Sequence, residues 1–302
     1  MAKNKIVIIS PVRDEADLIQ GTIDSTVNQT LRPVEWIIVD DGSTDGTTEI
    51  VEKACAKHDW IHIVKKPNRG VRAVGPGVVE AFYYGYDRIK TKDYDFVCKM
   101  DGDIEFKPKY FETLVSLFKN DKYLGAASGK PFQRADDGTL TEERHNDEMV
   151  AGMINFYKRK CFEDMGGFVR EVHWDGIAYH ACRIAGWRTG SFRHEDLNFL
   201  HLRLMGSSHK GIIHGRMRWG KGQYFMGTHP LYIFGIGAYR TFEKPFLIGG
   251  FFIVIGYFRA MLAGMRRFGD DKFRKSLHAW QFENLGIGKR LEQIPPPEPE
   301  KD

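Results

Sequence analysis

Two aspartates one residue apart, Asp101 and Asp103, form an acidic pattern with a clear chemical use. They follow residues 96–100 (FVCKM), a mostly apolar run typical of a buried strand. In an extended chain, residues i and i+2 point the same way, so both carboxylates can face one point. Such a pair can share a hard divalent cation, which often also holds substrate phosphates. The alternative interpretation is a simple turn, because Asp and Gly are common turn residues.

A second acidic cluster occupies residues 40–46 (DDGSTDG). The spacing of an EF-hand calcium loop is matched by Asp41, Ser43, Asp45 and Gly46, with Glu52 eleven residues after Asp41. An EF-hand loop follows a helix, however, whereas residues 35–39 (EWIIV) have the pattern of a strand, and no second loop is present to pair with it. We therefore predict a strand, a tight turn and a helix that starts near residues 44–47 with Ser/Thr caps. An Asp at the tip of such a strand can accept hydrogen bonds from a nucleobase or a ribose.

The first hundred residues predict a scaffold that would bring these clusters together. Short β-branched runs at residues 6–9, 36–39, 61–64 and 94–100 alternate with segments of helical periodicity. Apolar strands separated by helices indicate an α/β fold with a Rossmann-like, mostly parallel sheet flanked by helices. Ligands bind such open sheets at the carboxyl ends of the strands. The first strand is expected to end in residues 10–15 (SPVRDE), which would join the acidic clusters at that edge.

Composition excludes several classes of protein. A chain of 302 residues with 42% apolar and 28% charged residues can bury a core, which excludes global disorder. A net charge of only +4 argues against a dedicated nucleic-acid binder. The cysteines lack CxxC or CxxH spacing, which argues against a zinc knuckle or a disulfide scaffold and fits a reducing compartment. No signal peptide precedes the first strand, so we expect a cytoplasmic protein.

Three motifs in this order resemble the family 2 glycosyltransferases of GT-A fold: residues 8–15 (IISPVRDE), 39–47 (VDDGSTDGT) and 101–103 (DGD). A weaker match continues to about residue 190, with GGF at 166–168, WD at 174–175 and AGW at 185–187. The resemblance implies a GT-A-type fold, a nucleotide-sugar donor (a UDP-sugar above all), Mn²⁺ or Mg²⁺ as cofactor, and inversion at the anomeric carbon. The acceptor would be a glycan or a lipid-linked sugar in the synthesis of surface polysaccharide or glycolipid.

The resemblance also implies roles for individual residues. Asp103 would be the main metal ligand, with Asp101 assisting. Asp175 falls where the family's catalytic base lies, although Trp174 stands where the family commonly has Glu. The donor-binding set implied is Ser10, Pro11, Arg13, Glu15, Asp41, Arg72, Asp101 and Arg218, with Ser10 and Asp41 at the nucleoside. Glu195 and Asp196 form a rival acidic pair for the base.

Two downstream features have both a functional and an ordinary interpretation. Some glycosyltransferases of this fold add a histidine ligand from a late loop, and His201 is our candidate; an ordinary surface or core histidine is the alternative. Residues 215–222 (GRMRWGKG) are predicted to form a loop that closes over the diphosphate. Its glycines would permit movement, and its Arg and Lys residues would supply charge-assisted hydrogen bonds. A solvated basic loop is the alternative.

The C-terminal part contains an apolar helical segment. Residues 246–258 form a run of 13 residues without charge, shorter than the roughly 20 needed to cross a bilayer. Basic residues follow it, so the segment is either a buried helical hairpin or an interfacial segment that meets anionic lipid. We favour peripheral contact with the inner face of the cell membrane, and we expect the tail from residue 295 to be disordered. The expected division is a nucleotide-sugar-binding half (1–130), an acceptor-binding and catalytic half of the same domain (131–230), and membrane-associated helices with the tail (231–302).

Two other functions remain open at this point. Sugar-phosphate nucleotidyltransferases share a related fold, but they usually carry a Gly-rich loop after the first strand, where this chain has no glycine until Gly21. A calcium-binding or nucleotide-binding module without turnover is the other alternative.

Overall fold

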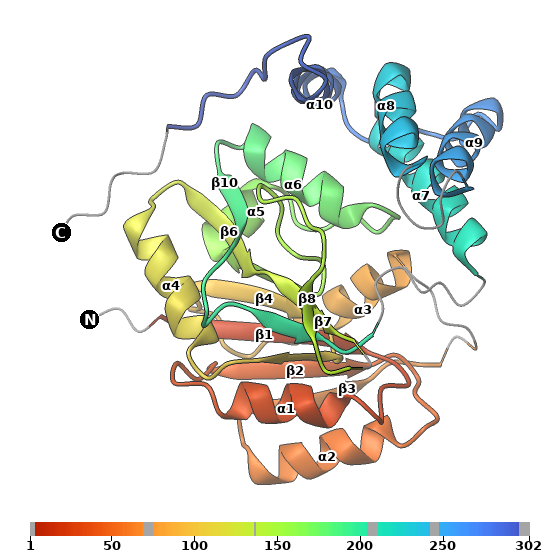
Figure 1. Ribbon diagram of the computed structural model, residues 1–302. Coiled ribbons are helices and arrows are strands. Elements are labelled where there is room, and N and C mark those ends of the chain that lie inside the picture. Colours follow the sequence, from red (N-terminus) through yellow and green to blue (C-terminus); the bar gives the residue numbers. More distant parts are fainter. Residues whose placement is uncertain are drawn as a thin grey trace.

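A mostly parallel sheet forms the centre of the molecule (Figure 1). The computed structural model describes residues 4–68, 70, 75–135, 137–203, 211–241 and 248–295. Within these residues the main sheet has the strand order β10-β6-β9-β4-β1-β2-β3. Its strands are β1 (Ile6–Val12), β2 (Glu35–Asp40), β3 (Ile61–Lys65), β4 (Phe96–Met100), β6 (Leu124–Gly129), β9 (Ile154–Lys158) and β10 (Arg188–Phe192). Every pairing is parallel except those of β9, which runs antiparallel to β4 and β6. The predicted fold class is confirmed.

Helices cover both faces of this sheet, as the apolar strands require. In β1, Ile6 and Ile8 belong to the core on one face and Val7 and Ile9 to the core on the other, and all four are fully buried. The first face is covered by α1 (Ile19–Val27), α2 (Thr47–Lys57) and α4 (Tyr110–Asn120). The second is covered by α3 (Pro76–Tyr86), α5 (Arg159–Asp164) and α6 (Trp174–Ile184). Alternate residues of an extended strand point to opposite faces, so a strand between two helical layers must be apolar throughout.

A smaller sheet lies at the carboxyl edge of the main one. Its strand order is β5-β11-β7-β8, with β5 (Ile104–Phe106), β7 (Pro131–Arg134), β8 (Leu140–Glu142) and β11 (Phe199–His201). Strand β5 starts directly after Asp103, and β11 runs antiparallel to it with His201 opposite Ile104. This register brings together two candidate metal ligands that are far apart in the sequence.

The C-terminal helices pack beyond α6 (Figure 1). They are α7 (Ile212–Met226), α8 (Pro230–Thr241), α9 (Ile248–Leu262) and α10 (Asp271–Asn284). The prediction of a mobile loop at residues 215–222 is therefore wrong, because these residues lie inside α7. The glycines serve close helix packing instead: a Cβ on Gly220 would lie 1.9 Å from the carbonyl oxygen of Ile253 in α9, and one on Gly256 would lie 2.2 Å from that of Met217 in α7.

This close approach predicts the effect of a single methyl group. We expect Gly256→Ala to lower the free energy of unfolding by about 1–3 kcal/mol, because the helices must move apart. Gly249→Ala in the same helix is the matched control, since its Cβ would meet other atoms only at an ordinary 3.6 Å. Thermal unfolding of both variants measures the difference. Equal melting temperatures would contradict the packing role of Gly256.

Strand β1 extends through Ser10 and Pro11 to Val12, within the segment where we expected it to end. Residues 131–230 contribute β9 and β10 to the main sheet. One further detail differs from the expectations. Helix α2 begins as predicted, but its N-cap is Gly46 at φ 101° rather than a Ser or Thr, and Asp45 accepts the hydrogen bond from the Thr47 amide at 3.0 Å.

Candidate active site

The acidic clusters meet at the carboxyl edge of the main sheet. Strand β1 lies between β2 and β4, and all three run parallel. Asp41 directly follows β2 and Asp103 lies three residues after β4, so both lie at the same edge, on either side of β1. The central prediction, that these two tips converge, agrees with this arrangement.

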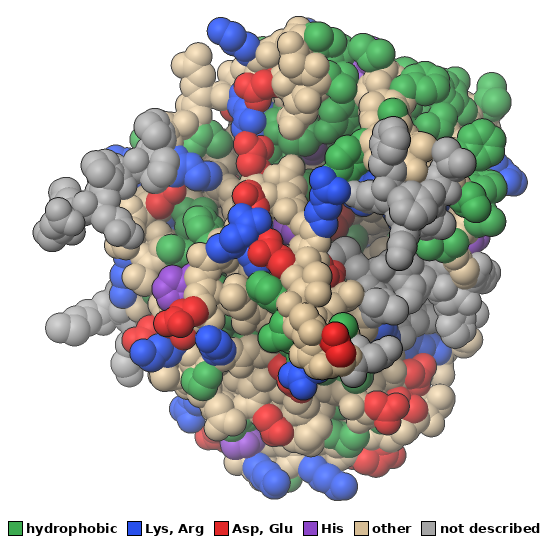
Figure 2. All heavy atoms as spheres, in the orientation of Figure 1, with side chains coloured by type: hydrophobic (Ala, Val, Ile, Leu, Met, Phe, Trp, Pro, Cys, Tyr) green, Lys and Arg blue, Asp and Glu red, His purple; other side chains and the backbone are tan. Residues whose placement is uncertain are grey.

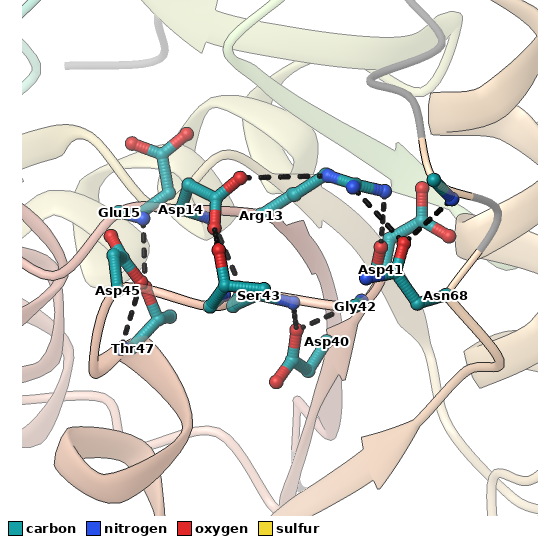
Figure 3. Close-up of polar contacts among 12 residues, drawn as sticks. Arg13, Asp14, Glu15, Asp40, Asp41, Gly42, Ser43, Asp45, Thr47 and Asn68 are labelled. Carbon is teal, nitrogen blue, oxygen red and sulfur yellow. Dashed lines mark hydrogen bonds and ion pairs between the residues drawn. The ribbon is translucent and has the colours of Figure 1, made fainter.

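Side-chain hydrogen bonds hold the turn after β2 in shape. Asp40 Oδ1 accepts from the amides of Gly42 and Ser43, at 3.1 and 2.8 Å. Asp14 and Glu15, from the turn after β1, donate their amides to the hydroxyls of Ser43 and Thr47, at 3.0 and 2.8 Å. Figure 3 shows these two turns side by side. The segment is thus a strand-to-helix turn. It follows a strand, and the Asp45 carboxylate accepts from the amides of Ala16 and Thr47, which does not fit an EF-hand.

Arg13, from the end of β1, reaches across to the residues that follow β2 and β3 (Figure 3). Its guanidinium donates to the carbonyl oxygen of Asp41 at 2.8 Å and to Asn68 Oδ1 at 3.1 Å. Lys66 Nζ donates to Asp41 Oδ1 at 3.1 Å. Sequence reasoning missed Lys66 and Asn68, although both follow β3 and parallel strands end at one edge. The result is a polar surface with both cationic and anionic groups, suited to a nucleoside and its phosphates.

Two members of the implied donor-binding set are less accessible in the structure, and one cannot be placed. Ser10 is fully buried, and its hydroxyl accepts the indole N–H of Trp36 at 2.9 Å. Its side chain therefore points into the core and not to the nucleoside surface, which corrects the expected contact. Glu15 is also buried, and its carboxylate is engaged as described below. Pro11 is half-buried within β1, and Arg72 lies outside the described residues.

Asp103 and His201 lie together in a buried position. Both residues are only 8% exposed, and His201 Nε2 lies 3.8 Å from Asp103 Oδ2. The other ring nitrogen, Nδ1, lies 2.8 Å from Glu143 Oε1. The remaining carboxylate oxygen of Glu143 is buried and has no hydrogen-bond partner. A histidine whose one nitrogen is held by a carboxylate presents the other nitrogen to a metal ion in a fixed direction.

The electrostatics around Asp103 favour a cation. Burial raises the pKa of Asp103, and the neighbouring Asp101 carboxylate raises it further, against His201 and Arg203. Burial opposes the protonation of His201, but its hydrogen bond to Glu143 and the Asp103 carboxylate give a net rise in the pKa of the ring. A buried carboxylate that is costly to ionise gains from a nearby positive charge.

Asp101 has a different partner. Lys99 Nζ donates to Asp101 Oδ1 and, at 2.8 Å, to the carbonyl oxygen of Gly152. Among the residues described by the structure, no three His, Cys, Asp or Glu side chains are arranged to hold a metal ion. Of the three predicted ligands, Asp103 and His201 lie close to each other, and Asp101 pairs with Lys99. Mg²⁺ and similar ions are commonly held by one or two protein ligands plus substrate phosphates, so the two residues fit such an ion.

An ion pair links the first turn to this acidic site. Arg203 Nη1 donates to Glu15 Oε1 at 3.1 Å, and Arg203 Nε lies 3.9 Å from Asp103 Oδ2. Glu15, which was expected in the donor-binding set, therefore holds Arg203 beside Asp103. Sequence reasoning did not single out Arg203.

Asp175 lies at the N-terminal end of α6, close to the Asp101 side of the site. The Asp175 side chain is exposed. It lies near Gly152: a Cβ atom added to that glycine would be 3.5 Å from Asp175 Oδ2. The carbonyl oxygen of Gly152 accepts the hydrogen bond from Lys99. Trp174, which stands where the family commonly has Glu, is buried, and Lys99 Nζ lies 5.3 Å from the centroid of its ring. Hydrogen bonds thus join Asp101, Lys99 and the Gly152 carbonyl, and the candidate base Asp175 lies near Gly152.

Helix α7 packs against the start of α6. Gln223 Nε2 lies 3.0 Å from His173 Nε2, next to Trp174. Arg218 is half-buried one turn earlier, and burial lowers the pKa of its guanidinium. Burial also lowers the pKa of His173 to about 4, with Asp175 opposing and Arg218 adding to the shift. Arg218 therefore lies on the Asp175 side of the site, on a helix and not on a closing loop. The rival pair, Glu195 and Asp196, follows β10, where the Asp196 amide donates to His194 Nδ1.

Known proteins are similar to this chain in sequence and in fold. The chain is 25% identical to the poly-β-1,6-N-acetyl-D-glucosamine synthase of Staphylococcus aureus (strain MSSA476) over 229 residues, which cover 69% of this chain and 52% of that protein. It is 29% identical to the hyaluronan synthase of Pasteurella multocida over 146 residues, 47% of this chain and 14% of that protein. The chain thus spans about half or less of the length of these relatives.

Solved structures show the same GT-A architecture. The mannosyltransferase PcManGT of Pyrobaculum calidifontis, in complex with GDP-Man and Mn²⁺, aligns with a TM-score of 0.53 at 17% identity, over 94% of this chain and 83% of its own. TarS of S. aureus, in complex with UDP-GlcNAc, aligns with a TM-score of 0.53 at 13% identity, over 86% and 73%. The model of glycosyl transferase family 2 matches residues 7–176, more than half of the chain and all three motifs. The protein therefore belongs to glycosyl transferase family 2.

Proposed function

We propose that this protein is a metal-dependent, inverting glycosyltransferase that moves a sugar from a nucleoside diphosphate to an acceptor hydroxyl. The observation that carries the proposal is the buried pair Asp103 and His201, at the same sheet edge as Asp41. Two protein ligands leave coordination positions for a diphosphate. The polar turn after β2 offers groups for a nucleoside next to it.

In the mechanism that this site supports, Asp175 removes the proton of the acceptor hydroxyl. The hydroxyl oxygen attacks the anomeric carbon from the face opposite the diphosphate, the new C–O bond forms, and the bond to the diphosphate oxygen breaks with its electron pair. Asp103 and His201 would hold Mn²⁺ or Mg²⁺, which would neutralise charge on the departing diphosphate. Arg203, held beside Asp103 by Glu15, adds a positive charge at the same place.

The ligands and names of similar proteins support a nucleotide sugar as the donor. The aligned structures contain GDP-Man or UDP-GlcNAc, and the matched relatives are named as synthases of polysaccharides. We propose a UDP-sugar as the donor and a glycan or a lipid-linked sugar as the acceptor.

Thermal unfolding with a panel of nucleotide sugars tests the proposal. A donor that binds only the folded state raises the melting temperature by mass action. We expect a rise with one UDP-sugar in the presence of Mn²⁺ and a much smaller one with EDTA, followed by metal-dependent release of UDP. If no donor in the panel stabilises the protein and no nucleoside diphosphate is released, the proposal is wrong. Release of pyrophosphate from a nucleoside triphosphate would indicate a nucleotidyltransferase instead.

A further inference from the structure

Large apolar side chains are exposed on α8 and α9. Figure 2 shows hydrophobic side chains gathered at the upper right, over these helices. Phe234 is 53% exposed, Phe251 62% and Leu262 84%. Leu231 and Ile248 are also exposed on these helices. A contiguous exposed apolar patch commonly marks an interaction site, whereas single exposed apolar residues scattered over a surface do not.

These residues form one continuous face, which we call the α8–α9 apolar face. In α9, Phe251, Phe258 and Leu262 are seven and four residues apart and therefore lie on one side of the helix. The ring of Phe258 lies 5.5 Å from that of Phe234 in α8, centroid to centroid. The outward sides of the two helices thus meet along this aromatic contact.

The helical segments around the face carry charges of one sign. Residues 211–241 and 248–269 contain Arg216, Arg218, Lys221, Arg240, Arg259, Arg266 and Arg267 and no Asp or Glu. Arg259 is exposed in the last turn of α9, and Arg266 is exposed four residues after the end of that helix. An apolar face flanked by cations matches the chemistry of an anionic lipid surface.

We propose that the α8–α9 apolar face docks on the surface of an anionic lipid bilayer. Among the described residues no helix has the length and apolar character needed to cross a bilayer, so the contact is interfacial. A second copy of the chain is a poorer occupant, because a symmetric contact would bring the two cationic borders together. Docking would place the acceptor side of the molecule near the lipid, since α7 packs on both α9 and the start of α6.

Vesicle binding of the full chain tests the docking without any measurement of activity, so its result is independent of the proposed function. We expect the protein to sediment with vesicles of phosphatidylglycerol and phosphatidylcholine, and much less with phosphatidylcholine alone. Raised salt should weaken the binding through screening. The variant F234S/F251S/L262S should bind roughly 100-fold more weakly. Replacing Arg259 and Arg266 with Gln should reduce binding only to the anionic vesicles.

The matched control is L140S/I287S/L291S, which removes side chains of similar exposure (54%, 64% and 63%) elsewhere on the surface. Its binding should equal that of the unmodified protein, and circular dichroism should show that both triple variants fold. Equal binding by F234S/F251S/L262S and the unmodified protein would overturn the proposal. So would a dimer that depends on Phe234, Phe251 and Leu262 without any binding to vesicles.

Discussion

Asp103→Asn is expected to lower the rate of sugar transfer by about 100- to 1,000-fold and to remove the metal-dependent stabilisation by the donor. The amide is a weaker ligand for a hard cation, and charge stabilisation by a metal contributes several kcal/mol to such reactions. Initial rates at saturating Mn²⁺, together with donor-dependent melting temperatures, measure both effects.

The stability of the metal-free Asp103→Asn protein separates this effect from misfolding. Burial raises the pKa of Asp103, so the ionised carboxylate is less favourable in the folded than in the unfolded state at neutral pH. Removing that charge should leave the metal-free protein at least as stable as before. Asp137→Asn, in the exposed turn between β7 and β8, is the matched control and should keep full activity. An Asp103→Asn enzyme with activity within threefold of normal would exclude Asp103 as the main ligand.

Asp175→Asn is expected to reduce kcat by about 100- to 10,000-fold while the donor still binds. A positioned general base contributes this much to a proton transfer, and the amide cannot accept the proton. The amide can keep the local hydrogen bond, because Asp175 Oδ1 accepts from the Gly176 amide at 2.8 Å. We therefore expect the metal-dependent shift of the melting temperature by the donor to be unchanged. Steady-state kinetics with varied donor should show a loss in kcat with an unchanged KM.

The rival acidic pair provides the comparison for this second experiment. Glu195→Gln and Asp196→Asn should retain activity, because this pair follows β10 and the Asp196 carboxylate lies 4.0 Å from His194 Nδ1, whereas Asp175 lies near Gly152. If these variants lose activity and Asp175→Asn keeps it, the base has been assigned to the wrong residue.

Local sequence signals predicted the fold of the first hundred residues well. The β-branched runs around Ile8 and Ile38 became β1 and β2, and the helical pattern of Val79 and Phe82 became α3. The strands are buried on both faces and the helix along one stripe. The spacing of apolar residues in the sequence therefore follows directly from which side chains are buried. The position of the acidic motifs could also be predicted, because the turns that follow parallel strands all lie at the same edge of the sheet.

Glycine was the misleading signal in the C-terminal part. The glycines of residues 215–222 suggested a mobile loop, yet Gly220 marks a close crossing of two helices. A missing side chain favours both a flexible backbone and close packing. The sequence alone cannot separate the two, because the partner helix begins more than 25 residues later.

The order of the residues by itself determined the alternating elements, the acidic tips of the strands and the family. These depend on neighbours within a few positions, whose spacing is set by backbone geometry. Only the tertiary structure decided that His201 lies beside Asp103, that Lys99 donates a hydrogen bond to Asp101, and that Ser10 points into the core. Each of these depends on which side chain the fold brings within hydrogen-bonding distance. For His201 the deciding step is the pairing of β11 with β5 across almost one hundred residues.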